Sequence, residues 1–489
     1  MKVIEVIKEK VSTNSLKLDN KKEFISSVFF LFVIYVLAII SIIRTNFNYI
    51  DDIRRNIDGH DLRGDFSRHI SQFLSHFLHA ENRLTDISPL PQLAACLILA
   101  LTGVILVKII CNKTNKYLLL ATLPLGLSPY FLSCLTYKFD APYMALSIFA
   151  SVFPFLFMQK KRWLFSLICV ASILVMTMTY QASSGIFIMM SIFIFFTNLM
   201  YKKDTVKNNF IFLGVSCVSY LFALILFRTF FLESVNSYVS TDLPETKNII
   251  AIFLRNIERF YLELNSDFNI KWKVLSIVIT AIFFTKTIIF SKINKILSFF
   301  LTFLYLSLLL ISVFGLYQIL ESPLFAPRAM YAFGFYLAIL SVDISFSLKK
   351  IFSFPAIILS WCFFVFSFTY GNALADQKRY DDFRTELLLN DLSHLLTERT
   401  EEPYFVEIVN NIGFSPVVEN VAVNNPVIKK TVHLNLKAGC PFMYIYLSKY
   451  HKFNLSADWE SVDETMPVIF DSYYHTIKGR DNKIVVILK

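Results

Sequence analysis

Repeated apolar runs of about 20 residues constrain this chain more than any other feature of its sequence. A run of this length crosses a bilayer as one helix, and many such runs make a polytopic membrane protein. Of the 489 residues, 55% are hydrophobic and 17% are charged, whereas about a quarter are charged in a soluble domain. We predict about eleven spans, at 24–43, 91–110, 117–135, 139–158, 163–180, 184–200, 209–231, 271–290, 296–318, 329–347 and 351–370.

The positions of the basic residues predict the orientation of these spans. Lys and Arg gather before the first span and in every second loop after it, at 2–22, 113–116, 160–162, 202–207, 292–295 and 349–350. Because cytoplasmic loops carry such an excess, we place the N-terminus in the cytoplasm. The loops 44–90 and 233–270 and the C-terminus then lie outside. The net charge of +10 reflects topology signals and contacts with anionic membrane lipids, so we expect no nucleic-acid partner.

Several other site classes find no support in the sequence. The seven cysteines form no CxxC pair or Cys/His cluster, so neither a disulfide framework nor a zinc site is predicted. No P-loop, GxGxxG or GxSxG motif occurs. The first span follows a long charged segment without a small-residue cleavage site, which favours a retained signal anchor over a cleaved signal peptide.

The loop after the first span carries the strongest candidate for chemistry. Adjacent carboxylates Asp51 and Asp52 stand just past the membrane, beside Arg54 and Arg55. A partly desolvated carboxylate can act as a general base toward a sugar hydroxyl. The other acid could orient the first or help to hold a divalent cation. An ordinary charged loop is the alternative, because exposed acids are common.

The same loop continues into a predicted amphipathic helix that would lie in the headgroup layer. Ser71 and Ser75 lie off its apolar stripe, and we expect aspartate to be tolerated better there than on the stripe. His69, His76 and His79 offer no third metal ligand of matching geometry, so we expect them to be exposed helix residues. An acidic pair above a membrane, beside such a helix, indicates chemistry on a lipid-linked substrate. The stripe consists of Phe66, Ile70, Phe73, Leu74, Phe77 and Leu78.

Three shorter outer turns add candidate binding residues. Lys138 could contact a phosphate and be oriented by Asp140; the alternative is a snorkelling lysine beside a turn acid. Arg328 follows two prolines and could bind a lipid phosphate through paired hydrogen bonds, or it could anchor the interface. Gln181 could hydrogen-bond a sugar, although its position favours core packing.

The spans themselves give little support to a transporter. An ion-coupled pump usually needs an ionisable group near the middle of the bilayer. Here Lys108, Arg228, Lys286 and Asp343 lie near span ends, where we expect them to snorkel. Transporters also tend to have paired broken helices, whereas these spans read as uninterrupted and the chain has 12 glycines.

From about residue 371 the composition becomes that of a soluble domain. We therefore divide the chain into a membrane region, 1–370, and a small α/β domain outside the membrane, 371–489. A helix is predicted over 376–397, and a turn at 479–482 is predicted to join the last two strands. The β-like runs are 403–409, 427–435, 442–447, 467–475 and 483–488.

Several motifs in the membrane region are similar to those of one family. They are YIDDIRRNIDG at 49–59, the Gly64–Arg68 helix start, ISPLPQ at 87–92, SPYFLSCLTYKFDAPYMALS at 128–147, TYQAS at 179–183 and PRAM at 327–330. In this order the chain resembles the type II O-antigen glucosyltransferases, the serotype-converting enzymes that phages bring to enteric bacteria. The resemblance covers most of the membrane region and does not extend through 371–489.

The resemblance implies a GT-C type enzyme of the bacterial inner membrane that modifies lipopolysaccharide at the periplasmic face. Its implied donor is undecaprenyl-phosphate glucose, supplied by a companion flippase and a glucosyl-phosphoprenol synthase. Its implied acceptor is a sugar of lipid-linked O-antigen, glucosylated with inversion. By family analogy Asp52 is the catalytic base and Asp51 its partner. We expect the substrate to be bound by Arg54, Arg55, Arg68, Lys138, Asp140, Gln181 and Arg328.

Three alternatives to this enzyme stay open at the level of the sequence. One is a polymerase or another transferase of lipid-linked sugars, and a second is a flippase for lipid-linked O-antigen sugars. A third is a membrane scaffold for cell-wall machinery, which would leave Asp51 and Asp52 without a role. The leaving group of the implied donor is already good, so no cofactor is required, although a divalent cation could take part.

Overall fold

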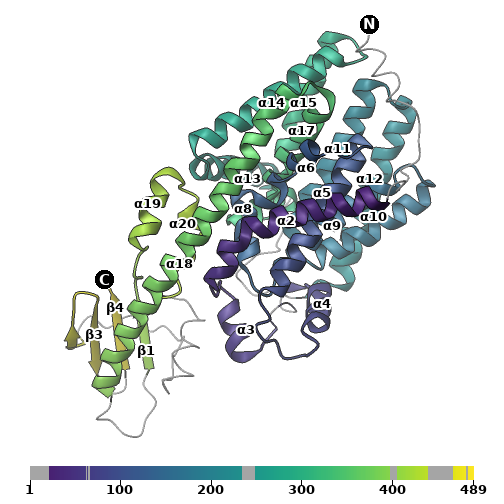
Figure 1. Cartoon of the computed structure of the whole chain (residues 1–489). Coiled ribbons are helices and arrows are strands. Elements are labelled where there is room, and N and C mark those ends of the chain that lie inside the picture. The colour runs from purple at the N-terminus through teal and green to yellow at the C-terminus, as the bar shows by residue number, and fades with distance from the viewer. Residues whose placement is uncertain are drawn as a thin grey trace.

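A computed structural model of the chain describes residues 21–61, 63, 66–233, 248–396, 405–438, 466–480 and 483–489. Figure 1 shows a large helical bundle and a smaller C-terminal part, which a single long helix joins. The short helices α3 and α4 lie at the end of the bundle that is nearer to the C-terminal sheet. We call this end the α3–α4 end.

The first half of the bundle contains the acid pair and its surroundings. Its helices are α2 (Lys21–Thr45), α3 (Asp52–Asp58), α4 (His69–His79), α5 (Leu90–Cys111), α6 (Lys116–Leu120), α7 (Pro124–Leu127), α8 (Pro129–Thr136), α9 (Ala141–Val152), α10 (Arg162–Thr177) and α11 (Ser184–Tyr201). The second half begins with α12 (Val206–Phe230), α13 (Ile249–Asp267), α14 (Ile270–Phe290), α15 (Lys295–Ser312), α16 (Pro327–Met330) and α17 (Ala332–Ser347). Then follow α18 (Phe354–Leu396), α19 (Pro416–Asn424) and α20 (Ile428–Thr431).

The predicted apolar runs are all helical, but not all of them are full-length spans. Within the described ranges, eight helices are long and apolar enough to cross a membrane, or nine if one bent pair counts as a span. Two further runs form apolar helices of 10–17 residues, Ala141–Phe157 and Arg162–Thr177. At 1.5 Å per residue such helices reach about 25 Å at most, short of the roughly 30 Å hydrocarbon core. The chain is a polytopic helical protein; the count of about eleven spans is not confirmed.

The bent pair corrects the expectation of uninterrupted spans. Helices Lys116–Leu127 and Pro129–Thr136 meet at 65°. Ser128 is extended (φ −56°, ψ 144°), as proline at the next position demands, and Pro129 has no backbone N–H for the preceding turn. The Ser128 hydroxyl accepts from Phe131 N–H and so caps the second piece. The bend directs the end of α8 toward the first loop.

The segments that were expected to share one side of the membrane lie together. At the α3–α4 end, Gln181 Nε2 donates to the Phe66 carbonyl (3.3 Å), joining the second outer turn to the first loop. At the opposite end, the Lys292 N–H donates to the Met200 carbonyl (2.9 Å), which joins the basic segment 292–295 to the end of α11, just before the basic segment 202–207. This grouping agrees with the alternation read from the basic residues, while the compartment at each end stays a prediction.

Two charged residues inside the bundle behave differently from the expectation. Lys286 Nζ on α14 lies 2.5 Å from Asp343 Oδ2 on α17, and both side chains are buried. They do not snorkel separately, because each neutralises the charge of the other. Burying either charge without its partner would be strongly destabilising. The pair links two helices at the end of the bundle opposite to the acid pair.

The C-terminal part is built on the extension of α18. This 43-residue helix runs without a break through 370/371 (Figure 1) and packs Leu388 and Leu392 on a four-stranded sheet. The sheet order is β1-β4-β3-β2, with β1 parallel to β4 and the other pairs antiparallel. Its strands are β1 (Phe405–Val409), β2 (Val468–Asp471), β3 (His475–Arg480) and β4 (Lys483–Leu488).

Some of the strand predictions for this part were wrong. Residues 427–435 contain α20 and an irregular stretch, because Ile428 and Thr431, one turn apart, are buried against the bundle. The run 467–475 divides into β2 and the start of β3. Gly479 and Arg480 belong to β3, which corrects the first half of the predicted turn, and 481–482 lie outside the described residues. The run 442–447 lies outside the described residues.

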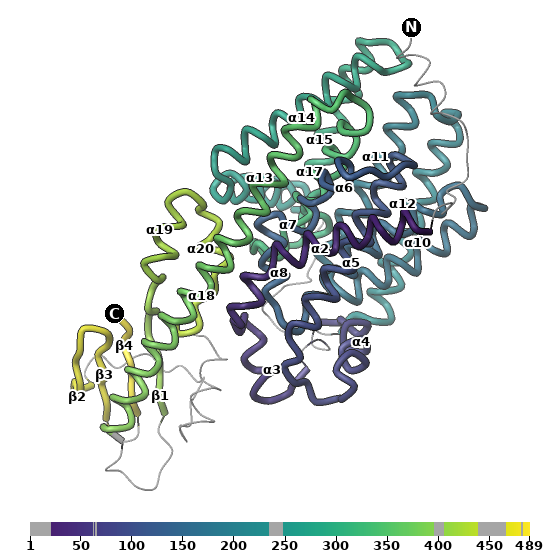
Figure 2. The backbone as a smooth tube through the Cα atoms, in the orientation of Figure 1, coloured from purple at the N-terminus to yellow at the C-terminus, as the bar shows by residue number. Residues whose placement is uncertain are grey.

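Helices α19 and α20 belong to the bundle more than to the sheet. Val418, Val427, Ile428 and Val432 join the large hydrophobic core of the bundle, while the sheet has its own smaller core. The tube in Figure 2 shows α19 and α20 alongside α18, between the bundle and the sheet. The predicted boundary at 370/371 therefore coincides with no break in packing.

Candidate active site

A sharp turn of the backbone presents the acid pair. Ile50 has φ of 49°, a left-handed conformation that a β-branched residue rarely adopts. The turn lets Asp52, at the start of α3, fold back so that its Oδ2 accepts from the Tyr49 N–H (3.0 Å). Strained backbone of this kind is typical of functional sites, where the surrounding structure holds it in place.

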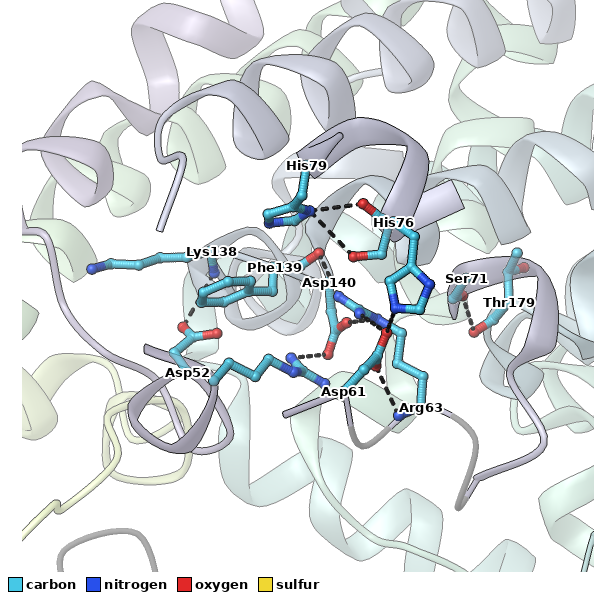
Figure 3. Close-up of polar contacts among 12 residues, drawn as sticks. Asp52, Asp61, Arg63, Ser71, His76, His79, Lys138, Phe139, Asp140 and Thr179 are labelled. Carbon is cyan, nitrogen blue, oxygen red and sulfur yellow. Dashed lines mark hydrogen bonds and ion pairs between the residues drawn. The ribbon is translucent and has the colours of Figure 1, made fainter. Parts of the chain in front are cut away.

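Asp52 is a fully buried carboxylate, and its two oxygens have different surroundings in the described part of the chain. Its Oδ2 also accepts from the Lys138 N–H (3.1 Å), which ties α3 to the turn after α8 (Figure 3). Its Oδ1 is buried and has no hydrogen-bond partner among the described residues. Burial raises the pKa of Asp52 to about 7, although Arg55 and the two N–H groups act in the opposite direction. A carboxyl group that titrates near neutrality suits general-base work.

Asp51 has a different environment from its neighbour. It is half-buried, immediately before α3, and its charge acts on Arg55 and on the Tyr137 hydroxyl. Because successive side chains diverge, the two acids do not share one position. Asp52 therefore has the raised proton affinity, and Asp51 is the more accessible of the two.

Asp140 holds two buried guanidinium groups in place. Its Oδ2 binds Arg55 Nη1 (2.7 Å), and its Oδ1 binds Arg63 Nε (2.8 Å). Burial alone would raise the pKa of Asp140, but Arg55, Arg63 and Arg68 outweigh it and hold that pKa well below its usual range. Asp140 therefore stays ionised and cannot serve as a base. Its role in this structure is to fix Arg55 next to Asp52, and Figure 3 shows Arg63 between Asp140 and Asp61.

Lys138 lies close to this network, but Asp140 does not orient it. The Lys138 Nζ donates to Asn48 Oδ1 (2.8 Å) and pairs with Asp86 Oδ2 (2.8 Å). The two side chains diverge at the turn, so Asp140 meets arginines while Lys138 points to the first loop. The expectation that Asp140 orients Lys138 was therefore wrong. Lys138 remains a cation of the site, only 4% exposed.

Arg68 and Arg328 form a second cationic group. The Arg68 guanidinium stacks over the Tyr180 ring at 4.6 Å from its centre, an arrangement that stabilises a cation. Arg328 lies on α16, and the charges of both arginines act on Tyr180 and Tyr317. Two guanidinium groups from distant segments thus approach one cluster of aromatic hydroxyls.

The remaining two predicted binding residues lie at the edge of the site. Gln181 uses its amide to hold the first loop through the Phe66 carbonyl. Arg54 lies on the outward side of α3, partly exposed and 4.0 Å from Asp58. No described contact directs either of them to the acid pair. Their assignment to substrate binding stays a prediction.

Helix α4 is amphipathic as predicted, but its polar face was assigned wrongly. Phe73 and Phe77 are 71% and 79% exposed, so the apolar stripe faces away from the bundle. Ser71 and Ser75 are buried, and Ser71 Oγ donates to the Thr179 carbonyl (3.2 Å). His79 is also buried. Small polar side chains allow the helix to pack closely on the bundle, which periodicity alone could not reveal.

The histidines of α4 differ from each other. The His79 ring stacks on Phe139 with ring centres 5.6 Å apart, so the expectation of an exposed residue was wrong for it. His76 Nε2 lies 3.4 Å from Asp61 Oδ2, and Asp61 also binds Arg63. Within the described ranges, no group of three or more His, Cys, Asp or Glu side chains could hold a metal ion.

Sequence reasoning missed four polar residues around the acid pair. Asp61 and Asp86 lie in the first loop itself, where their charge was the only available signal. His433 and Asn435 come from the segment after α20, and nothing in the local sequence connects them to this site. The ring centre of His433 lies 6.0 Å from that of Tyr49.

The structure thus combines a helical membrane protein with a cluster of buried acids and guanidinium groups at one end of its bundle. Comparison with family models gives the specific answer: the model for the glucosyl transferase GtrII matches residues 40–339. The chain belongs to this family of glucosyl transferases and is therefore a glycosyltransferase, which confirms the resemblance read from the motifs. The match includes the acid pair, Asp140 and Arg328. No curated protein and no solved structure gave a match.

Proposed function

We propose that this protein transfers glucose from undecaprenyl-phosphate glucose to a sugar of lipid-linked O-antigen at the periplasmic face of the bacterial inner membrane. The observation that carries the proposal is Asp52, which is buried beside the membrane region with a pKa of about 7 and has one oxygen without a hydrogen-bond partner among the described residues. Membership of the glucosyl transferase family identifies glucose as the sugar that is transferred. The polyprenyl donor, the acceptor and the GT-C type fold are part of the proposal.

The chemical step is an inverting substitution at the anomeric carbon. Asp52 Oδ1 accepts the proton of an acceptor hydroxyl while the hydroxyl oxygen forms a bond to C1 of glucose. The bond between C1 and the phosphate oxygen breaks, and its electron pair leaves with undecaprenyl phosphate. A β-linked donor thus gives an α-glucoside. The protein needs only a base and cations for the departing phosphate, with no nucleotide site.

The cations divide between two tasks in this proposal. Asp140 holds Arg55 beside Asp52. The charge of Arg55 favours the ionised form of Asp52, so it helps Asp52 to lose the proton that it takes up in each turnover. Arg68 and Arg328, near Tyr180 and Tyr317, take the phosphate of the donor, because guanidinium groups bind phosphate through paired hydrogen bonds. The exposed Phe73 and Phe77 keep α4 in the headgroup layer, where the lipid phosphate arrives.

The test uses purified protein in nanodiscs with radiolabelled undecaprenyl-phosphate glucose and lipid-linked O-antigen. We expect label to move to the glycan, and the new linkage to be α by NMR. In cells, expression together with the companion flippase and synthase should add glucose to O-antigen without changing its chain length. Longer O-antigen chains with no added glucose would favour a polymerase. Movement of the donor across the bilayer, with no transfer, would favour a flippase.

A further inference from the structure

Helix α20 and the residues directly after it, 432–435, form one segment that is anchored at the α3–α4 end of the bundle. The Thr431 carbonyl accepts from two tyrosine hydroxyls, Tyr49 in the first loop (2.8 Å) and Tyr370 on α18 (3.1 Å). One turn of backbone is therefore fixed by residues more than 300 positions apart. Tyr49 is also the residue whose N–H binds Asp52.

An ion pair fixes the same segment from the other side. Lys430 Nζ binds Asp267 Oδ1 (2.5 Å) and Glu263 Oε2, both at the end of α13. Asp267 is buried and also accepts from the Tyr130 hydroxyl (2.8 Å) on α8. The segment is thus held between the first loop, α8, α13 and α18. Its position relative to Asp52 is set by packing.

Two buried polar atoms of this segment lack a hydrogen-bond partner in the part of the chain that the structure describes. They are Nε2 of His433 and Oδ1 of Asn435, neither of which has a hydrogen-bond partner among the described residues. Leaving a buried polar group unsatisfied costs about 1–3 kcal/mol, so such an atom needs a partner, which a bound ligand or a water can supply. The other groups of Asn435 are engaged: its N–H faces Asp381 and its Nδ2 faces the Asn48 carbonyl.

The chemistry of these two atoms suits a neutral polyhydroxylated ligand. Burial, with Lys437 and Arg328, lowers the pKa of His433 to about 3, so the ring is uncharged at neutral pH. A neutral imidazole can donate a hydrogen bond to a hydroxyl group or accept one from it, and an amide oxygen can accept one. Neither group carries a charge that would select an ion. A phosphate would instead select the guanidinium groups of Arg68 and Arg328.

We propose that His433 and Asn435 bind the acceptor sugar and set which of its hydroxyls reaches Asp52. The inference rests on the proposed function and assigns the C-terminal segment to the acceptor side of the same site. We assign the two residues to the acceptor and not to the donor because they contact Asn48 and Tyr49, and this part of the first loop leads directly to Asp52. Both are acceptor-binding residues and take no part in proton transfer.

The experiment measures two-substrate kinetics in nanodiscs for His433→Ala and Asn435→Ala. Loss of one hydrogen bond to a neutral hydroxyl should raise the KM for lipid-linked acceptor about tenfold, with the KM for undecaprenyl-phosphate glucose within twofold of wild type. Slow hydrolysis of the donor, in which water replaces the acceptor, should be unchanged. His433→Gln keeps a hydrogen-bonding end and should recover part of the acceptor affinity. His394→Ala, on the exposed surface of α18, is the matched control and should change none of these values.

The outcomes separate this inference from the proposed function. An active wild type whose variants keep a normal acceptor KM overturns the inference alone. Equal rises in the KM of donor and acceptor, or loss of donor hydrolysis, also overturn it, because they indicate a structural or donor-side role. A wild type that transfers no glucose from the polyprenyl donor overturns the proposed function and the inference with it.

Discussion

Replacement of Asp52 by asparagine separates catalysis from folding more cleanly than any other change in this chain. Asparagine has nearly the shape of aspartate, and its amide oxygen can accept from the same N–H groups of Tyr49 and Lys138. It cannot accept a proton. The variant should therefore keep the local structure and lose only the base.

The magnitude of the stability change follows from the pKa. Burial raises the pKa of Asp52 from 3.8 to about 7, about 3 pH units, which corresponds to roughly 4 kcal/mol at 1.36 kcal/mol per unit. Because the folded pKa is above the unfolded one, Asp52 destabilises the wild type progressively as pH rises from about 4 to about 7. Asp52→Asn has no such penalty. It should be more stable than wild type at pH 7.5, and the difference should disappear near pH 4.

The assay compares heat stability and transfer in one preparation. Fluorescence-detected size exclusion after heating at pH 4.5 and 7.5 should show the pH-dependent gain for Asp52→Asn. Glucosyl transfer should fall about a hundred- to ten-thousand-fold, the usual cost of removing a general base. Wild-type transfer should fall about tenfold per pH unit below 7, since only the ionised base is active.

Asp58→Asn is the matched control, because Asp58 ends the same short helix and pairs with Arg54 at the surface. It should leave transfer and its pH profile close to wild type. The reasoning is refuted if Asp52→Asn retains near-normal transfer, or if wild-type transfer stays level down to pH 5. A variant that is inactive and also less stable at pH 7.5 would show that Asp52 acts through structure. Loss of activity in Asp51→Asn alone would transfer the role of base to Asp51.

Three further predictions concern the contact of α4 with the membrane, the donor phosphate and the orientation of the chain. Phe77→Asp places a charge on the exposed apolar face of α4 and should lower transfer several-fold, while the protein accumulates normally in the membrane. Ser75→Asp buries a charge, so it should reduce the amount of protein in the membrane, which an immunoblot measures. Arg328→Lys should raise the KM for the donor about tenfold, since an ammonium lacks the paired donors of guanidinium; an unchanged KM would assign Arg328 to anchoring. Reporter fusions after Lys350 should be active in the cytoplasm and fusions at Lys489 in the periplasm, and a cytoplasmic Lys489 would reverse the assigned face.

The sequence alone determined the features that depend on local periodicity. Apolar runs of fixed length identify membrane helices because the bilayer has a fixed thickness. The stripe through Phe73 and Phe77 identified an amphipathic helix for a similar reason. Adjacent acids in a loop between spans, together with the family motifs, were sufficient to single out Asp51 and Asp52.

Only the tertiary structure decided what surrounds those acids. Asp140 meets Arg55 across 85 positions of sequence, and the partner of Lys138 is Asp86 instead of the nearby Asp140. The burial that raises the pKa of Asp52 has no local signature, because it depends on the bend at Pro129 and on the turn at Ile50. His433 reaches the first loop from the far end of the chain for the same physical reason: proximity in a packed bundle is set by contacts between distant helices, and periodicity within one segment carries no record of them.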